Sequence, residues 1–248
     1  MQAVTANENC QDIVKRCFLL RELDDDTRQA ILAEGHMRRV EAGGFFFHQG
    51  EPSEWLYVIY NGRVKLVQLT LGGEQVVVNY FGPGQGLGII VALNDTEYPL
   101  SAEAVEACAA IGWHRDEMKQ LMLRHPQLAL NGMKMMGSRF TRLQERFHDV
   151  STKRVEQRIA RAMLRLVRQF GKRVEEGLLI DIPLTRQDIA EMTGTNLYNV
   201  SRILSKWEQE GWIVSHRKQV ILCNAHDLVV LAEDLTNDPF SGVAEVAE

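Results

Sequence analysis

The chain lacks the long apolar runs of a membrane protein. No run approaches the roughly 20 residues that a helix needs to span a bilayer. Its first ten residues, MQAVTANENC, also lack the basic-then-apolar order of a signal peptide. We therefore expect a cytoplasmic protein with no membrane partner. The 248 residues are 45% hydrophobic and 25% charged, which is typical of globular proteins, and the length favours two domains with separate cores.

Cysteine is scarce and scattered. The four cysteines are Cys10, Cys17, Cys108 and Cys223, and no two of them have the CxxC spacing of a metal-ligand pair. In a cytoplasmic protein they are expected to be free thiols, and structural zinc is not expected. An iron–sulfur cluster needs about four converging thiolates, whereas Cys10 and Cys17 supply two. Redox sensing through these two thiols stays open.

Catalytic motifs are missing as well. The histidines of the N-terminal half, His36, His48 and His114, form no His-x-His ligand pair, and no nucleophile motif accompanies them. We therefore expect no enzyme. A metal-binding enzyme of the cupin type is the minor alternative, because jelly rolls of that class bind metals through clustered His and Glu.

The chain has no overall excess of basic residues. Its net charge of −5 argues against indiscriminate binding to nucleic acid. Residues 151–224, however, contain 13 Lys and Arg against 8 Asp and Glu, which leaves a net charge of +5 there and −10 elsewhere. Attraction to DNA phosphates requires such a local excess, so residues 151–224 are the candidate DNA-binding part.

The segment Leu184–Ile213 predicts a helix-turn-helix followed by a strand. Thr185 can cap the first helix, with Asp188 three residues later as in a capping box. Gly194 is placed to end this helix at a sharp turn, and Asn196 can cap the second helix. This is the arrangement of a DNA-reading motif. Taken alone, the segment could equally be a solvated helix pair of an unrelated bundle.

The helical period separates the two faces of this motif. Ile189, Ala190 and Met192 of the first helix, and Leu197, Val200, Ile203, Leu204 and Trp207 of the second, are expected to face inward. Ser205 is expected on the outward face. A face of short polar groups with one arginine suits the major groove, where a guanidinium can bind guanine O6 and N7. The predicted DNA-binding residues are Thr195, Asn196, Tyr198, Asn199, Ser201, Arg202, Lys206, Arg217 and Lys218.

The N-terminal half has the period of short strands. After a helical segment at Asp24–Glu34, strand-like runs appear in FFFHQG, WLYVIYNGRVKLVQLT, EQVVVNYF and SAEAVEACAAIGWH. Glycines and prolines separate them, with a Gly-Gly hairpin at Gly72 and Gly73. Many short strands with such turns predict an antiparallel β-roll or jelly roll.

A long helix follows the strands. The stretch Glu117–Val150 is helical, with a break at Pro126. Arg139, Arg142, Glu145 and Arg146 are expected on its flanking faces. Apolar residues recur at spacings of four and three, which predicts a heptad seam for a homodimer, although packing against the chain's own β-domain is the alternative. The predicted seam consists of Ala129, Met133, Met136, Phe140, Leu143, Phe147 and Val150.

The C-terminal third surrounds the helix-turn-helix with supporting elements. A helix, VEQRIARAMLRLVRQF, ends at Gly171; a linker, KRVEEG, and a strand in LLIDIPL follow. After Gly211, WIVSH and QVILCN predict a hairpin, or wing, whose tip carries His216, Arg217 and Lys218 toward phosphates. The fold class is thus α+β. The predicted parts are a sensory β-roll domain with flanking helices (1–126), a dimerisation helix (127–150), a winged helix-turn-helix domain (151–235) and a disordered tail (236–248).

This order of elements, and several motifs within it, resemble the Crp/Fnr family of bacterial transcription regulators. The motifs are HQGE at His48–Glu51, YNGRVKL at Tyr60–Leu66, GPGQGLG at Gly82–Gly88, RIARAMLRL at Arg158–Leu166 and LTRQDIAEMTG at Leu184–Gly194. The resemblance spans nearly the whole chain. It implies a cyclic-nucleotide-binding-like domain and a homodimer that binds palindromic promoter DNA, with RNA polymerase as a partner.

The resemblance also assigns roles in the reading helix. Arg202 matches the arginine that family members aim at a guanine. Tyr198 stands where the family often has Glu, which implies a different half-site. The alternative, a regulatory module that uses its winged helix for protein contact only, does not account for the +5 charge of residues 151–224 or for Arg202 on the outward face.

The effector is not readable from the motifs. Cyclic-nucleotide-binding members use an Arg-Ser pair and a Glu after the last cassette glycine, whereas here Ile89 follows Gly88 and EYPLSA has no arginine. We therefore do not expect cyclic AMP, because a buried phosphate needs a cation. The candidate small-molecule pocket is apolar and consists of Gly86, Leu87, Gly88, Ile89, Ile90, Leu100 and Ser101.

Haem is the alternative cofactor. The segment Thr195–Trp212 is similar to that of nitrogen-oxide-responsive regulators, some of which use haem, which would make this chain a nitric oxide sensor. An imidazole would then bind the iron. The candidates are His36, His48, His114, His125 and His148, each of which is more commonly a surface or packing residue.

Overall fold

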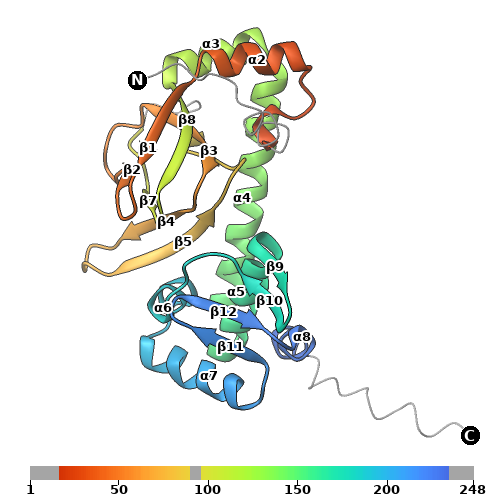
Figure 1. Cartoon of the computed structure of the whole chain (residues 1–248). Coiled ribbons are helices and arrows are strands. Elements are labelled where there is room, and N and C mark those ends of the chain that lie inside the picture. The colour runs from red at the N-terminus through yellow and green to blue at the C-terminus, as the bar shows by residue number, and fades with distance from the viewer. Residues whose placement is uncertain (1–16, 90–95, 235–248) are drawn as a thin grey trace, which may run out of the picture. The chain divides into compact units, whose positions relative to one another are not determined.

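The computed structural model describes residues 17–89 and 96–234 (Figure 1). The chain divides into two compact units between Gln144 and Glu145. This division falls inside the long helix, which therefore contributes residues to both units. Among the described residues, no helix is both long and apolar enough to cross a membrane. The predicted tail at 236–248 lies outside the described residues.

The N-terminal unit is a β-roll with helices at its ends. In chain order its elements are η1 (Phe18–Leu20), α2 (Asp25–Ala33), β1 (His36–Val40), β2 (Phe45–Phe47), β3 (Trp55–Asn61), β4 (Val64–Leu69), β5 (Gln75–Phe81), β6 (Gly86–Leu87), β7 (Ser101–Ala104), β8 (Cys108–His114), α3 (Arg115–Arg124) and α4 (Pro126–Thr152). Its strands form two antiparallel sheets, ordered β1-β8-β3-β6 and β2-β7-β4-β5. The predicted β-roll is confirmed.

Turn residues account for much of this strand pattern. Gly62 has a φ of 87° between β3 and β4, and Gly73 has a φ of 80° in the hairpin that joins β4 to β5. Glycine adopts such left-handed angles without a steric cost. The predicted Gly-Gly hairpin is therefore confirmed. Strand β1 was not predicted, because its sequence HMRRV lacks the alternation of apolar and polar residues.

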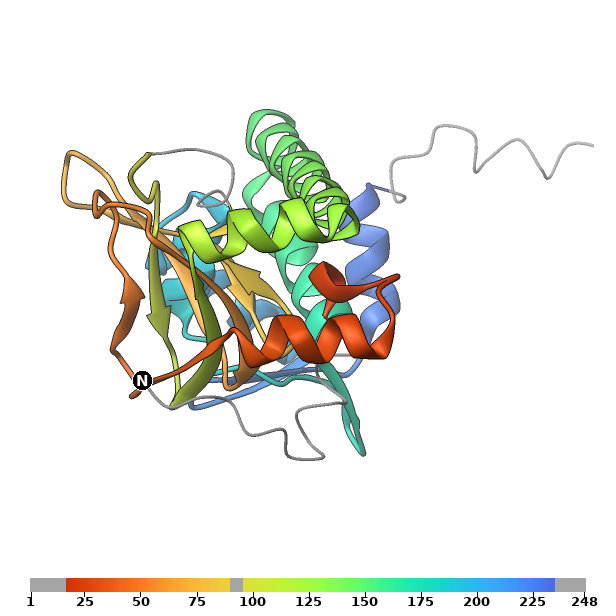
Figure 2. The same ribbon diagram turned by 90° about the horizontal axis from the view of Figure 1, so that it is seen from above.

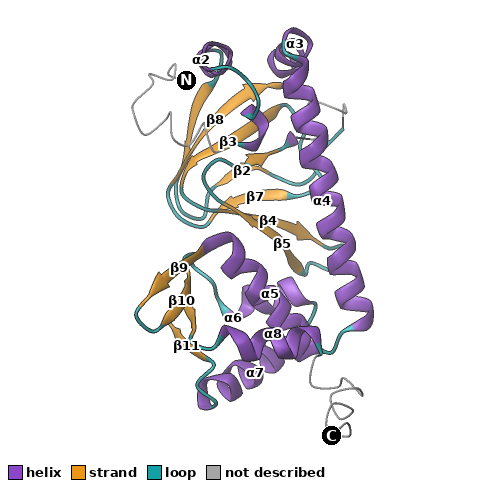
Figure 3. Ribbon diagram, turned by 90° about the vertical axis from the view of Figure 1, so that its right-hand side faces the viewer, coloured by secondary structure: helices purple, strands orange, loops and turns teal. Residues whose placement is uncertain are grey.

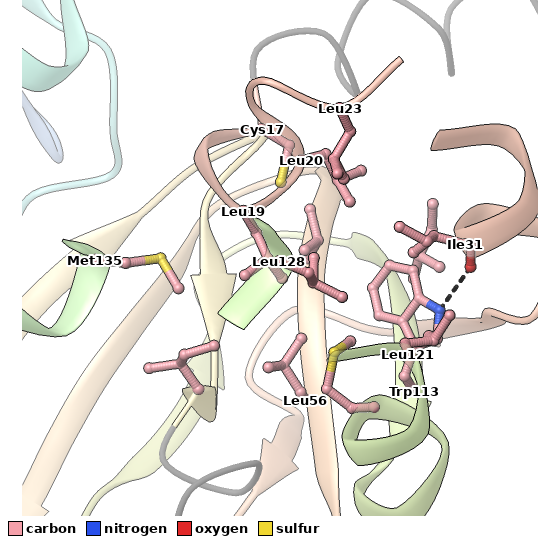
Figure 4. Close-up of a cluster of buried hydrophobic side chains, with 14 residues drawn as sticks. Cys17, Leu19, Leu20, Leu23, Ile31, Leu56, Trp113, Leu121, Leu128 and Met135 are labelled. Carbon is pink, nitrogen blue, oxygen red and sulfur yellow. Dashed lines mark hydrogen bonds between the residues drawn. The ribbon is translucent and has the colours of Figure 1, made fainter. Parts of the chain in front are cut away.

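Two apolar cores hold this unit together. The inner core lies between the sheets and includes Ala102 and Ala104 of β7, which alternate with the less buried Ser101 and Glu103. The outer core lies between the sheet of β1, β3 and β8 and the helices. It includes Trp113, whose indole Nε1 donates a hydrogen bond of 2.9 Å to the carbonyl oxygen of Ile31 (Figure 4).

Helices α2, α3 and the start of α4 lie beside the strands of this unit (Figure 2). Asp24 caps α2 by accepting a hydrogen bond of 2.8 Å from the Thr27 backbone nitrogen. Pro126 begins α4 after the break at His125, as predicted, since proline suits the first helical position, where no backbone donor is needed. Helix α4 then runs without a further break to Thr152.

The C-terminal unit consists of helices packed with a four-stranded sheet. After α4 it contains α5 (Val155–Phe170), β9 (Gly171–Val174), β10 (Gly177–Ile180), α6 (Arg186–Thr193), α7 (Leu197–Gln209), β11 (Ile213–His216), β12 (Gln219–Leu222) and α8 (Ala225–Glu233). The sheet order is β11-β12-β10-β9. The predicted helix-turn-helix and wing are confirmed.

Two features of this unit differ from the sequence expectations. The predicted linker KRVEEG is mostly strand β9 and a tight turn, because residues 171–174 pair with residues 177–180 in a hairpin. Helix α8 was not predicted; Asn224 caps it, and its Leu228 and Ala232 are buried. The short apolar run LVVLA has no clear helical period by itself, and packing against α5 decides its conformation.

Candidate nucleic-acid interface and effector pocket

The first helix of the helix-turn-helix begins with a reciprocal cap. The backbone nitrogen of Asp188 donates to Thr185 Oγ1 over 3.0 Å, and the backbone nitrogen of Thr185 donates to Asp188 Oδ2 over 2.9 Å. Both donors would otherwise lack a partner at the start of α6. The predicted capping box is confirmed, and it fixes where α6 begins.

The turn between α6 and α7 is held by an arginine of α5. Gly194 ends α6 with a φ of 61°, as predicted. The Arg158 guanidinium donates from Nε to the carbonyl oxygen of Thr193 over 2.9 Å and from Nη2 to that of Gly194 over 3.1 Å. It thereby satisfies carbonyl groups that a helix end leaves without a donor. Arg158 lies within the RIARAMLRL motif, but the sequence does not indicate this role, because the contact spans 36 residues.

The second helix, α7, is fixed at its start and on its inner side. Asn196 caps it by accepting 2.9 Å from the Asn199 backbone nitrogen, as predicted. Glu156 of α5 accepts from Trp207 Nε1 over 3.0 Å and from Lys206 Nζ over 3.1 Å. The hydrogen bond and charge of Glu156 raise the pKa of Lys206. Lys206 is thus bound within the unit on one side while its side chain stays half exposed.

Helix α7, whose ribbon is drawn in Figure 3, carries most of the predicted reading residues, several of them exposed. Tyr198 is 74% exposed, Arg202 is exposed, and Asn199 Nδ2 donates to Thr195 Oγ1 over 3.1 Å. Asn196 is also exposed, whereas Ser201 and Ser205 are half buried. The predicted inward residues of α7 are buried, with one exception, Leu197.

Leu197 is 48% exposed, so its predicted burial is wrong. It is the first residue of α7, one turn ahead of Val200, and the core that buries Val200 does not extend to it. Met192 of α6 is likewise only half buried.

The wing places two cations beside this face. Strands β11 and β12 pair from Ile213 with Leu222 to His216 with Gln219, so that Arg217 and Lys218 form the tip, and both are exposed. Lys218 has a φ of 61°, which is uncommon for a residue other than glycine. Its carbonyl accepts 3.0 Å from the backbone nitrogen of Leu184, which attaches the wing tip to the segment before α6.

The described members of the predicted effector pocket belong to two different cores. Leu87 is fully buried in the inner core, and Leu100 packs against that same core. Ile89 is buried in the outer core instead. Ser101 Oγ accepts 2.9 Å from the Gln49 backbone nitrogen. Ile90 lies outside the described residues, and Gly86, Gly88 and Leu87 form the short segment that follows β5.

An arginine that the sequence analysis placed on a flank of the long helix lies against this segment. The Arg139 guanidinium donates to the carbonyl oxygen of Gly86 and lies over the Phe81 ring, 5.1 Å from its centroid. Burial and, to a smaller extent, the nearby like charge of Arg142 lower the pKa of Arg139 to about 10. The position follows from the spacing Leu128, Gly132, Met135, Arg139, a second stripe on α4 that the heptad analysis did not use.

The predicted dimer seam is largely uncovered in the single chain. Five of its residues are more than half exposed: Met133 (54%), Phe140 (62%), Leu143 (57%), Phe147 (74%) and Val150 (54%). Ala129 and Met136 are half buried. Packing against the chain's own described residues, the alternative interpretation, therefore does not cover this stripe.

The described cysteines do not present a reactive pair. Cys17 is 1% exposed within the outer core, and burial raises the pKa of its thiol to about 11. Cys108 is buried, and Cys223 is exposed in the other unit. Cys10 lies outside the described residues. The described residues contain no group of three or more His, Cys, Asp or Glu placed to hold a metal ion.

The candidate haem ligands have structural contacts. His36 Nε2 lies 3.2 Å from Glu117 Oε1, and the His114 side chain caps α3. His48 is exposed and packs on the Phe45 ring at a centroid distance of 4.3 Å. His148 is exposed and His125 ends α3. The haem alternative remains a prediction without an observed apolar imidazole site.

Comparison with known proteins agrees with both units. Residues 157–231 match the Crp-like helix-turn-helix domain, and residues 37–125 match the cyclic nucleotide-binding domain. The chain is 27% identical over 210 residues to the transcriptional activator protein anr of Pseudomonas aeruginosa, covering 84% of each chain. It is 29% identical over 165 residues to the cyclic AMP receptor protein of Thermus thermophilus, covering 66% of this chain and 73% of that protein.

Solved structures share the fold. The structure of FixK2 from Bradyrhizobium japonicum superimposes with a TM-score of 0.70 at 22% identity, over 79% of this chain and 96% of that one. A β-roll domain followed by a long helix and a winged helix-turn-helix defines a DNA-binding transcription regulator. The chain belongs to the Crp/Fnr family of such regulators.

Proposed function

We propose that this regulator acts as a homodimer whose two α7 helices read the half-sites of a palindromic promoter sequence. The supporting observation is the exposed apolar stripe on α4. Phe140, Leu143 and Phe147 repeat at heptad spacing and are each more than half exposed, and a second copy of the same helix would bury them. Two reading helices must enter major grooves about 34 Å apart, which needs two protomers.

Within each half-site we assign direct reading to α7 and phosphate contact to the wing. Arg202 is exposed and bears the guanidinium that can bind guanine bidentately. Tyr198, at 74% exposure, is available to the neighbouring base or sugar. Thr195, Asn196, Asn199 and Ser201 border these two on the same helix. Arg217 and Lys218 of the wing, with Lys206, supply positive charge to the backbone.

We further propose that the β-roll unit senses an effector other than cyclic AMP. Ile89, at the position after the cassette glycine, is 1% exposed and fills the outer core, so it leaves no carboxylate for a ribose. An effector acts by binding one conformation of the dimer more tightly than another. RNA polymerase is the proposed partner on promoter DNA.

The dimer is tested by placing a charge on the seam. Leu143→Glu would bury a carboxylate at the interface and should convert the protein to a monomer in sedimentation velocity. Leu123→Glu is the matched control, because Leu123 is 74% exposed on α3 and lies outside the seam. Equal sedimentation of the two variants would contradict the proposed seam.

Palindrome reading is tested with the same pair of variants. Fluorescence anisotropy of a labelled palindromic duplex selected from random sequence should show binding that falls steeply with salt concentration. Leu143→Glu should weaken this binding strongly, whereas Leu123→Glu should not. A wild-type affinity that is the same for one half-site as for the palindrome would contradict dimeric reading.

A further inference from the structure

The outer half of the wing lacks a third strand. Strand β12 pairs with β11 over its whole length, whereas among the described residues it pairs with β10 only at Ile221 and Leu222. From Val220 to the tip, the wing is therefore a two-stranded hairpin. Such a hairpin is only marginally stable by itself, so contacts outside the sheet must hold the tip in place.

A cleft separates this part of the wing from α6. Its volume is about 370 Å³, and residues of α6, α7 and both wing strands line it. The apolar part of the lining includes Ile189 of α6, Leu204 of α7 and Val220 of β12. Packing is thus incomplete at this junction, and polar contacts across the cleft contribute to holding the wing.

Polar contacts connect the two sides of the cleft at two points in the described part of the chain. At the first, the backbone nitrogen of Leu184 donates to the carbonyl oxygen of Lys218 over 3.0 Å. The second is the carboxylate of Glu208, near the end of α7. Its Oε1 accepts a hydrogen bond from Ser215 Oγ of β11 and lies 3.5 Å from Arg186 Nη2 at the start of α6. One side chain thus joins α6, α7 and the wing.

The local structure explains why Glu208 reaches the wing. Alternate residues of a strand lie on the same face, so Ser215 lies on the side of the buried Ile213. Glu208 follows the buried Leu204 by one helical turn, and both Glu208 and Ser215 are half buried. A hydroxyl that donates to a carboxylate makes a stronger hydrogen bond than one that donates to a neutral acceptor.

The charge of Glu208 is opposite to the one that attracts phosphates. The basic residues Arg186, Arg217 and Lys218 line the cleft, and a carboxylate beside Arg186 offsets one of their charges. The side chains of the Arg186–Glu208 pair are 39% and 30% exposed, and ion pairs of this kind contribute little to stability. Neither attraction to DNA nor the ion pair accounts for a carboxylate at this position.

We propose that Glu208 is a positioning residue for DNA binding. Through Ser215 it holds the wing where Arg217 and Lys218 reach phosphates beside the half-site that α7 reads. This inference rests on the proposed reading of palindromic DNA, in which the wing contacts phosphates. Loss of the hydrogen bond leaves both cations on the wing but no longer fixes them relative to α7. Glu208 therefore favours DNA binding although its charge opposes it.

The test compares four variants of the full-length protein. Glu208→Ala removes the hydrogen bond and the charge, whereas Glu208→Gln removes the charge and keeps an oxygen acceptor. Ser215→Ala removes the hydrogen bond from the wing side, which keeps the test decisive if Glu208→Ala does not fold. Glu210→Gln is the matched charge control, because Glu210 is exposed and its side chain makes no hydrogen bond or ion pair with the described residues. Thermal midpoints check folding.

Fluorescence anisotropy with the selected palindrome is measured over a range of salt concentrations. Glu208→Ala and Ser215→Ala should each weaken binding by about fivefold or more, and lower the log–log salt slope by up to about 2 per protomer, because two cations leave their phosphates. Glu208→Gln should stay within about twofold of the wild type. Glu210→Gln should bind equally or more tightly. The preference at the base pair that Arg202 reads should not change.

A wing without its two cations provides the decisive background. In Arg217→Ala/Lys218→Asn, the further change Glu208→Ala should have no effect, because no cation is left to position. The same fold-loss in this background would overturn the proposal, and so would a Glu208→Ala variant that binds as tightly as Glu210→Gln. A wild type without salt-dependent preference for the palindrome would refute the proposed function and this inference with it. Normal wild-type binding with an unaffected Glu208→Ala would refute this inference alone.

Discussion

The two units keep their chemically active groups in different places. In the winged unit, Tyr198 and Arg202 stand on the surface of a well-anchored helix. In the β-roll unit, the groups of interest, Cys17 and Arg139, are turned inward. DNA is a large ligand that must be met from outside, whereas a small effector can be enclosed. Under the proposed function, the β-roll unit would sense through groups that it buries, and the winged unit would read DNA through groups that it exposes.

The largest expected effect is on the stability of the winged unit, where a buried aspartate is paired with two arginines. Asp149 is 2% exposed, and its Oδ1 lies 2.8 Å from Arg161 Nε and its Oδ2 2.6 Å from Arg165 Nη1. Asp149→Ala should lower the free energy of unfolding by about 3 kcal/mol, because Arg165 loses its carboxylate partner and Arg161 keeps only its more exposed one, Glu233. Urea unfolding, together with hydrogen exchange of the α5 amides, would measure the loss.

The β-roll unit offers the contrasting control for that prediction. Its Arg124–Glu34 pair has a similar distance of 2.7 Å but is exposed on both sides. Glu34→Ala should therefore leave the unfolding free energy unchanged within error. A loss of the same size in both variants would show that burial does not distinguish the two ion pairs.

The second expected effect lies in the β-roll unit and is a dependence of stability on pH. Cys17 has a folded pKa of about 11 against 9.0 for an unperturbed thiol. Because the unfolded thiol releases its proton first, stability is complete below pH 9 and falls as the pH rises toward 11. The loss reaches about 2.5 kcal/mol. Urea unfolding at pH 8 to 11 should show this slope in the wild type.

Cys17→Ala is the control for the pH dependence. It should be less stable at pH 8, since it leaves a small cavity in the outer core, but its stability should fall less between pH 9 and pH 11. The exposed Cys223 provides a comparison in the other unit: Cys223→Ala should keep the wild-type slope. Identical slopes in all three proteins would mean that the Cys17 thiol does not contribute.

A third effect concerns the reading face alone. Arg202→Ala should weaken binding to the best palindrome by about 2 kcal/mol per half-site and relax the preference at one base pair. Arg217→Ala, on the wing, should weaken binding to all sequences alike and reduce the salt dependence. Anisotropy against single-base variants of the palindrome separates the two. An Arg202→Ala variant that loses affinity uniformly would make Arg202 a phosphate contact.

The sequence predicted the winged unit in more detail than the β-roll unit for a physical reason. Caps such as Thr185 and Asn196, and the inward stripe of α7, depend on residues a few positions apart, which a helical period exposes. The role of Arg139 depends instead on where Gly86, 53 residues earlier, lies against α4. The predicted burial of Leu197 is wrong for the same reason, because tertiary packing and not the helical period determines where a core ends.

The smallest expected effect is at the wing tip, where we expect Lys218 to favour DNA binding and to lower stability. Lys218 holds a left-handed φ of 61° at an exposed turn, where glycine would be favoured by about 1 kcal/mol. Lys218→Gly should therefore raise the unfolding free energy by about that amount while it weakens DNA binding and lowers the salt slope.

The opposite signs of these two changes identify the role of Lys218. Lys218→Asn keeps a residue that tolerates the left-handed region but removes the charge, so its loss of DNA affinity should match that of Lys218→Gly. Because the Leu184 backbone nitrogen still has the residue 218 carbonyl as its acceptor in both variants, the wing should stay attached. If Lys218→Gly gained stability without losing affinity, the lysine would have no phosphate to contact, and the reading face would be confined to α7.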